Sequence, residues 1–520
     1  MSVHVEERKS VATPPRVERK RKWWIVGAVA AIALVCALIF LLRAWPFTQS
    51  NLTKELEQAT SSKVTIGGFR RTFVPHPGCV ADNVTLTRDD SPDTRATMVI
   101  AKLTVVGNVM GLFTRRVALV QLQGARALFP PFSAGVDWRP TESNIVIDKL
   151  VAHDALLEFS RVNAKPAHAA NDPVQFKVHD FVGLHLAARD PMKFEVHLQN
   201  PVPPGDVHVT GMFGPWKMDR VSSTPLSGTY EFRQADLGVF GGIRGMLSSG
   251  GKFQGTLESI AVEGDTTTPD FTVRGSTHKV DLRSQFRAEV DPSNGDVVLH
   301  QVAAKVLQTL VVSQGSVAQH PDRDGKTAAL DLAVHQGRIQ DLLLMFVSEK
   351  QAPLSGAVSL KAKATIPPGE EPFLKKVQMT GSFGIENALF TKQDTQQDVG
   401  KLSASARGQT EEVNDPESVV SNLEGHVEVR DGVANFSDLS FRVPGAVAHL
   451  HGTFNLITEK VDLRGILLME ATLPQATTGI KSFLLRALDP FLKKNRQGGA
   501  KFPISITGTY QKPEYRADPV

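Results

Sequence analysis

Beyond position 62 the chain alternates between apolar and polar residues with a period of two. The clearest segments are 63–69, 83–88, 117–129, 193–200, 206–213, 279–291 and 426–443. Successive side chains of a β-strand point to opposite faces, so this period gives each strand one apolar and one polar face. Turn-forming residues separate the segments, as at 292–296, 321–325 and 430–432. The pattern predicts a mainly β protein, built as an elongated, curled antiparallel sheet with one apolar face.

A second pattern is a glycine followed two positions later by an aromatic residue or leucine. It begins at Gly211, Gly228, Gly255, Gly381, Gly452 and Gly508. The spacing is irregular, which excludes a repeat of fixed length. Glycine inside a strand commonly marks a bulge or a bend. The phrase therefore predicts a sheet that bends repeatedly, unless it recurs by chance in a glycine-rich chain.

A few segments have the period of a short helix instead. Just before the first strand, Leu52 and Leu56 share one stripe, and Thr48 or Ser50 is a suitable N-cap. A second helix is expected within 337–350.

A third helix is expected at 477–495, where an apolar stripe is flanked by basic residues. The stripe comprises Ile480, Phe483, Leu484, Leu488, Phe491 and Leu492. Such an amphipathic helix suits contact with a membrane surface or a partner. The alternative is a helix that closes one end of the β core.

The strongest single signal is an apolar run of twenty uncharged residues from Trp23 to Leu42. At ~1.5 Å per residue a helix of this length crosses a hydrocarbon core of ~30 Å. Trp23, Trp24 and Trp45 lie where interfacial aromatic residues are found. We therefore expect a single-pass helix over 23–43. The alternative, a cleaved signal peptide, needs a shorter apolar core and a small-residue cleavage site, which the segment that follows does not have.

Charge and cysteine content further limit the ligands and the cellular location expected for this protein. Of the 58 basic and 54 acidic residues, seven basic and three acidic ones lie in 1–22, which leaves 51 of each in the remainder. Because residues 23–520 carry no net charge, they lack the excess of basic side chains with which proteins bind nucleic acid phosphates. The basic tail predicts a cytoplasmic N-terminus by the positive-inside rule. With Cys36 and Cys79 as the only cysteines there is no disulfide framework, so a bacterial periplasm fits the remainder better than a eukaryotic exterior.

The common signatures of catalysis do not occur in the sequence. It has no G-x-x-x-x-G-K-[ST] loop, no G-x-S-x-G elbow and no H-E-x-x-H helix. His449 and His451 point to one face of a strand but belong to its polar face, and no third metal ligand can be located. Asp322 and Asp324 resemble part of a calcium loop, but His320 stands where the first ligand is needed. We expect no catalytic residue, metal or cofactor.

The phrases TSSKVTIGGF and FPISITGTYQKPEYRAD belong to two segments that resemble the AsmA family, the AsmA- and TamB-like bridge-type lipid transfer proteins of the bacterial envelope. The first resembles its start and reads WPF, LTKELEQATSSKVTIGGF and PHPGCVADNVTL, with Ser62 where the family often has glycine. The second resembles its C-terminal region and reads GHVEVRDGVANFSDLSFRVPGAVAHLHGTFNLITEKVDLRG and FPISITGTYQKPEYRAD. Together they cover about a third of the chain.

The resemblance implies an inner-membrane protein whose β-sheet curls into an apolar groove. It further implies a role in phospholipid transport between the inner and outer membranes. The organisation then expected is a cytoplasmic tail (1–22), a transmembrane helix (23–43), an N-terminal AsmA-like β region (44–205), a middle β-groove region (206–370) and a C-terminal AsmA-like β region (371–520). Expected partners are phospholipid, the inner membrane and envelope proteins, with no nucleic acid.

Residues on one face of two neighbouring strands are the best-defined candidates for the groove lining. They are Leu450, Phe454, Leu456, Val461, Leu463 and Leu467. Asp462 and Arg464 alternate with them and should face water. The alternative is that these residues form an ordinary closed core.

Length sets an upper bound on the reach of such a sheet. At ~13 residues per strand and turn, the chain beyond position 43 would hold ~36 strands and span ~170 Å. Two alternatives to a lipid carrier remain. One is a periplasmic scaffold or chaperone-like factor for outer-membrane protein assembly, which offers sheet edges to clients. The other is an envelope hydrolase without a recognisable motif.

Overall fold

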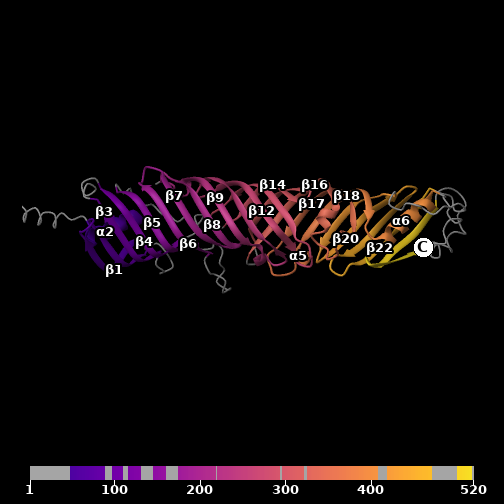
Figure 1. Ribbon diagram of the computed structural model, residues 1–520, viewed down its shortest axis with the longest axis horizontal. Coiled ribbons are helices and arrows are strands. Elements are labelled where there is room, and N and C mark those ends of the chain that lie inside the picture. The colour runs from indigo at the N-terminus through magenta and orange to yellow at the C-terminus, as the bar shows by residue number, and fades with distance from the viewer. Residues whose placement is uncertain are drawn as a thin grey trace, which may run out of the picture.

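The computed structural model describes residues 47–87, 97–108, 115–129, 145–159, 174–217, 219–292, 295–320, 325–407, 419–470 and 500–517. Within them the chain forms a mainly β protein, with 24 strands in one long curled sheet and four short α-helices. The strands follow one another in chain order along the molecule, and they run obliquely to its long axis (Figure 1).

The strands of the N-terminal half are β1 (Lys63–Thr72), β2 (Gly78–Thr87), β3 (Met98–Gly107), β4 (Arg116–Phe129), β5 (Val146–Phe159), β6 (Val174–Leu186), β7 (Met192–Pro201), β8 (Pro204–Phe213), β9 (Pro225–Asp236), β10 (Ile243–Arg244), β11 (Met246–Thr256) and β12 (Ile260–Val273). Those of the C-terminal half are β13 (Val280–Val290), β14 (Val297–Val306), β15 (Thr309–Gln319), β16 (Lys326–Arg338), β17 (Leu354–Ile366), β18 (Gln378–Phe390), β19 (Ser421–Arg430), β20 (Val433–Val443), β21 (Ala446–Asn455), β22 (Lys460–Met469), β23 (Ala500–Thr509) and β24 (Lys512–Ala517). The helices are α2 (Gln49–Thr60), α4 (Ile339–Leu343), α5 (Phe373–Lys376) and α6 (Gln393–Ala406), with 3₁₀ turns η2 (Val221–Ser223) and η3 (Leu237–Phe240).

Most neighbouring strands are antiparallel, as expected, but one pair is not. Strands β4 and β5 are parallel, in register from Arg116 opposite Val146 to Phe129 opposite Phe159. A parallel pair requires a crossover of about a dozen residues or more. Residues 130–145 separate these two strands, which is enough chain for one. The prediction of a fully antiparallel sheet was wrong at this point, because alternation does not encode strand direction.

The number of strands is also smaller than expected. The described residues hold 24 strands rather than ~36, because individual strands reach 14 residues and several link segments are long. Without the two-residue β10, the other 23 strands make 22 steps. At ~4.8 Å per step the sheet is ~105 Å long, well below the ~170 Å bound.

The sheet curls so far that its two rims meet. We call the rim with the β9–β11, β12–β13 and β16–β17 connections the first rim, and the rim with the β17–β18 and β23–β24 connections the second rim. Lys376 Nζ, on the second rim, donates hydrogen bonds to the carbonyl oxygens of Gly369 (2.8 Å) and, across the opening, of Phe240 on the first rim (3.0 Å). A 13-residue strand such as β17 is ~43 Å long, so the rims can meet only because the sheet wraps round.

Glycines make this curvature possible at positions where backbones approach closely. A Cβ added to Gly452 would lie 2.1 Å from the carbonyl oxygen of Asp462 on the neighbouring strand, and Gly452 has a φ of +138°. A Cβ added to Gly228 would lie 2.2 Å from the carbonyl oxygen of Thr210. Both glycines belong to the Gly-x-aromatic phrase, so its interpretation as a bend marker is supported.

Helices cover the inside of the curl near its two ends (Figure 1). At the N-terminal end α2 begins at the N-cap Thr48, whose hydroxyl accepts a hydrogen bond from the Asn51 N–H (3.2 Å). Its Leu52 and Leu56 pack on a core of β1–β6 residues that includes Val84 and Leu103. The predicted first helix and one of its two suggested N-caps are therefore confirmed.

At the C-terminal end α6 packs through Val399, Leu402 and Ala406 against β20–β23. The sequence did not predict this helix. Its residues include Gly400 and several Ser and Thr, which have low helix propensity, so tertiary packing supplies the stability. The helix expected within 337–350 is present only as the five-residue α4.

Several predicted features lie outside the described residues. These are the tail 1–22, the helix 23–43 with Trp23, Trp24 and Trp45, and the amphipathic helix 477–495. Among the residues that the structure describes, no helix is long and apolar enough to cross a membrane.

Candidate functional site

The inside of the curl, which we call the concave face, carries mainly apolar residues, with glycine, serine and threonine among them. Along each strand its positions alternate with exposed positions on the opposite, convex face, for example in β12 and β13. On β9 to β16 one concave position within the paired register is charged, that of Lys326 at the start of β16, where the ammonium pairs with Asp296. One row of direct cross-strand partners runs through Tyr230, Gly251, Gly264, Phe286, Val302, Ser313 and Leu332.

The six residues predicted to line the groove lie together on this face. Phe454 is the direct partner of Val461, Gly452 of Leu463, and Ala448 of Leu467. Leu456 follows β21 and joins Phe454 in packing on a cluster of β19 and β20 residues.

The polar residues that alternate with these six lie on the convex face, as predicted. His449 and His451 are exposed on the convex face. Asp462 and Arg464 are exposed as well and form an ion pair, with Nε to Oδ1 at 3.4 Å.

These six residues differ in how deeply they are buried. Leu450 and Leu467 are only 5% and 3% exposed, because they belong to the core that α6 covers. Phe454, Val461 and Leu463 are half-buried. The closed-core alternative therefore holds for Leu450 and Leu467, whose surface is already occupied by the protein itself.

The middle of the sheet is different, and sequence reasoning singled out no residue there. On β9, β11, β12 and β13 most concave positions are half-buried rather than buried. The large side chains among them include Leu226, Tyr230, Phe232, Phe253, Val262 and Phe286. The signal that could have found them is the alternation in 225–290, which is as regular as that of 446–469.

Aromatic rings lie over the glycines of neighbouring strands in this middle part. A Cβ added to Gly228 would lie 2.8 Å from Cζ of Phe253, and one added to Gly211 would lie 3.1 Å from Cζ of Phe194. Rings that cover glycine in this way shield exposed backbone and smooth the surface. The concave face is therefore lined by flat rings as well as by branched side chains.

The few polar groups on this part of the concave face bond to one another. The Tyr230 hydroxyl lies 3.0 Å from Oγ of Ser249, and Oγ1 of Thr266 lies 2.5 Å from Oγ of Ser284. Burial raises the pKa of Tyr230, so its hydroxyl stays neutral under ordinary conditions. Hydroxyl pairs without charge leave the surface compatible with an apolar ligand.

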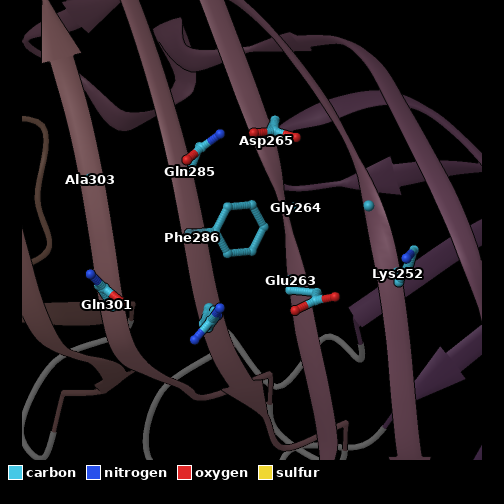
Figure 2. Close-up of a pocket in the computed structure, with 10 residues that line it drawn as sticks. Lys252, Glu263, Gly264, Asp265, Gln285, Phe286, Gln301 and Ala303 are labelled. Carbon is cyan, nitrogen blue, oxygen red and sulfur yellow. The ribbon is translucent and has the colours of Figure 1, made fainter.

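A separate hollow of about 390 Å³ lies among β11 to β14. Figure 2 shows Lys252, Glu263, Asp265, Gln285 and Gln301 around it. These side chains belong to exposed, convex positions that alternate with concave ones such as Phe286. Gly251, Gly264 and Phe286 of the concave row also line this hollow. Charged and amide side chains therefore stand beside the Phe286 ring, and the hollow is mixed rather than apolar in character.

No arrangement for metal binding or thiol chemistry stands out in the described part of the chain. It contains no group of three or more His, Cys, Asp or Glu side chains placed to hold a metal ion. Cys79 is buried, and this burial raises the pKa of its thiol to about 11, which keeps the reactive thiolate scarce at neutral pH.

No model of a known protein family matches this chain, and comparisons with curated proteins and with solved structures gave no match either.

Proposed function

We propose that this protein binds phospholipid through its acyl chains in an apolar groove formed by the concave face, and that it assists phospholipid transport between the inner and outer membranes. The observation that carries the proposal is the concave face of β9 to β16, which is half-exposed, continuous from strand to strand and without charged side chains except Lys326 at the start of β16. Soluble proteins rarely leave an apolar surface of this extent without a ligand or partner.

The energetic reason for such a surface is the cost of moving lipid through water. Exposing an acyl chain of ~16 carbons costs ~13 kcal/mol at ~0.8 kcal/mol per methylene. An apolar surface that follows the lipid removes most of that cost. Binding and release need neither a catalytic residue nor a cofactor.

The proposed setting follows from the sequence. A transmembrane helix over 23–43 would hold the protein in the bacterial inner membrane, with the N-terminus in the cytoplasm and the sheet in the periplasm. A sheet of ~105 Å forms a path many lipids long. If the gap between the membranes is wider, a partner at the far end would complete the path.

Photo-crosslinking tests the proposal on the full-length protein purified with its lipids. A photoreactive amino acid at Phe286 should capture phospholipid, whereas one at the adjacent convex position Gln285 should not. Phe454 and His451 form a second matched pair near the capped end. Mass spectrometry identifies the adduct. Equal capture within both pairs, or none at any position, would refute a lipid-binding concave face.

A scaffold for outer-membrane protein assembly is the second candidate, because the sheet has two edges. Among the described residues β1 pairs only with β2, and β24 only with β23. Unpaired strand edges are templates for pairing with a client. Replacing Phe253 and Phe286 with Asp should abolish lipid occupancy if the main proposal holds. The scaffold function would be favoured if the variant still captured outer-membrane protein clients and the wild-type protein held no lipid.

A further inference from the structure

The segment 344–353, between α4 and β17, runs across the opening between the two rims. We call it the strap. Both ends of the concave face are covered, by α2 at one end and α6 at the other, so the strap lies where a ligand would have to enter from the side.

The strap is fixed firmly to the first rim, at the β12–β13 connection. The hydroxyl of Ser276 lies 3.1 and 3.0 Å from the carbonyl oxygens of Leu344 and Val347. Thr277 Oγ1 donates a hydrogen bond to the Ser348 carbonyl oxygen at 3.0 Å. His278 Nε2 donates one to the Glu349 carbonyl oxygen at 2.6 Å, which places its ring proton on Nε2.

Toward the second rim the strap makes fewer and longer contacts. The rings of Phe346 and Phe373 stack with centroids 6.5 Å apart and planes inclined by 17°. Gln511 Nε2 donates a hydrogen bond to Glu349 Oε1 at 3.2 Å, and the Tyr510 hydroxyl donates one to the Pro353 carbonyl oxygen at 3.3 Å.

The strap's contacts with the first rim and with the second rim differ in the free energy that breaking them would cost. On the first rim the side chains bond to strap backbone, and the chain itself continues through α4 into β16. On the second rim the Gln511 to Glu349 contact joins two exposed side chains, and Phe346 is 36% exposed. Exposed polar contacts contribute little to stability. The strap therefore has a fixed side and a releasable side.

A second tie between the rims is of a different kind. The Lys376 ammonium is largely buried and is bonded to two carbonyl oxygens, one on each rim. Breaking this tie would leave the buried ammonium without its hydrogen-bond partner on the first rim, a loss that costs free energy for a buried charge. This tie, and a hydrogen bond from Lys392 Nζ on the first rim to the Gln511 carbonyl oxygen on the second, hold the curl closed. The strap can move away from the second rim without breaking either of them.

We propose that the strap is a side gate, which swings away from Phe373, Tyr510 and Gln511 to let an acyl chain reach the concave face and closes over it afterwards. This inference rests on the proposed lipid-binding function.

A reversible lock tests the gate in the full-length protein. In the double variant Glu349→Cys/Gln511→Cys, oxidation joins the strap to the second rim by a disulfide, whose formation is verified by the loss of both free thiols before any rate is compared, and reduction releases it. Transfer of a fluorescent phospholipid is followed from vesicles of phosphatidylethanolamine and phosphatidylglycerol, and lipid occupancy is measured separately by mass spectrometry. If the gate must open, oxidation lowers the transfer rate about tenfold or more while occupancy is unchanged. The single variant Glu349→Cys should show no such redox dependence.

The outcomes separate the gate from the function beneath it. Equal transfer rates in the oxidised and reduced forms of a lipid-loaded protein would overturn the gate and leave lipid binding intact. A protein that holds no lipid in either form would overturn both. If the disulfide variant does not fold, Phe373→Ala serves instead, because weakening the releasable side should accelerate transfer; an unchanged rate in that variant counts against the gate.

Discussion

Strands β21 and β22 and strands β11 to β13 carry the same alternation of apolar and polar residues, yet they bury it differently. In the first pair α6 lies on the concave face, and Leu450 and Leu467 are almost inaccessible to water. In the second group the concave positions stay half-exposed. Alternation therefore determines which face of a strand is apolar, whereas a separate covering element decides whether that face becomes a core or stays a surface.

The largest expected effect is at the covered end. Leu467→Ala should lower the free energy of local opening of β21 and β22 by about 3 kcal/mol, because it leaves a cavity beneath α6. Hydrogen exchange of the amides in these strands measures this energy. Ile466→Ala is the matched control, since Ile466 is 49% exposed on the convex face, and it should change the energy by less than about 0.5 kcal/mol. Equal effects at both positions would show that α6 does not create a core.

The second prediction concerns the covering helix itself. Gln396 is 4% exposed, accepts a hydrogen bond from the Phe390 N–H (2.9 Å) and donates one to the Val419 carbonyl oxygen (2.8 Å). Gln396→Ala leaves the buried Val419 carbonyl oxygen and the half-buried Phe390 N–H without this partner and should destabilise the docking of α6 by about 2 kcal/mol. Limited proteolysis of the α6 region should become faster.

Gln393→Ala is the control for that experiment, because Gln393 is an exposed residue in the first turn of the same helix. A proteolysis rate in Gln396→Ala no faster than in this control would mean that α6 is held by its apolar contacts alone.

The third prediction addresses the middle of the sheet. Phe286→Ala removes a half-buried ring, so the local opening energy of β13 should fall by only about 1 kcal/mol, less than a buried phenylalanine costs. Hydrogen exchange of the β13 amides provides the measurement. If the opening energy fell as much as in Leu467→Ala, the contrast between β11–β13 and β21–β22 would be contradicted. Such a result would indicate that the inside of the curl is filled at β13 as well.

Much of this architecture could be predicted from the sequence, because it depends on local pattern. Alternation separated Phe454 from His451 correctly, and Asp431 and Gly432 form the expected tight turn, with φ of 53° and 76°. The Gly-x-aromatic phrase marked positions, Gly228 and Gly452, where neighbouring backbones approach too closely for a Cβ atom. Each of these features is decided by neighbouring residues, so one sequence is sufficient to find it.

The features that the sequence did not reveal depend on residues far apart in the chain. Helix α6 has a weak helical pattern and is stabilised by strands up to about a hundred residues further on, such as β23. The parallel pairing of β4 with β5 and the meeting of the two rims leave no local signal. As a result the best lining candidates were placed at 450–467, where the surface is partly covered, rather than at 225–290.

The smallest expected effect is on the strap, which runs across the opening between the two rims. Burial and the nearby Glu349 and Glu459 raise the pKa of Tyr510 to about 12 from its usual 10. A raised pKa means that the closed state favours the neutral hydroxyl, so its contribution is complete below pH 10 and is lost as the pH rises from 10 toward 12. The strap should therefore exchange its amide hydrogens and react with proteases more readily across this window, after correction for the intrinsic rates. Tyr510→Phe has no hydroxyl to ionise, and it should start from weaker attachment but show no such rise. A wild-type strap whose corrected exchange is flat up to pH 12 would mean that Tyr510 does not hold it closed.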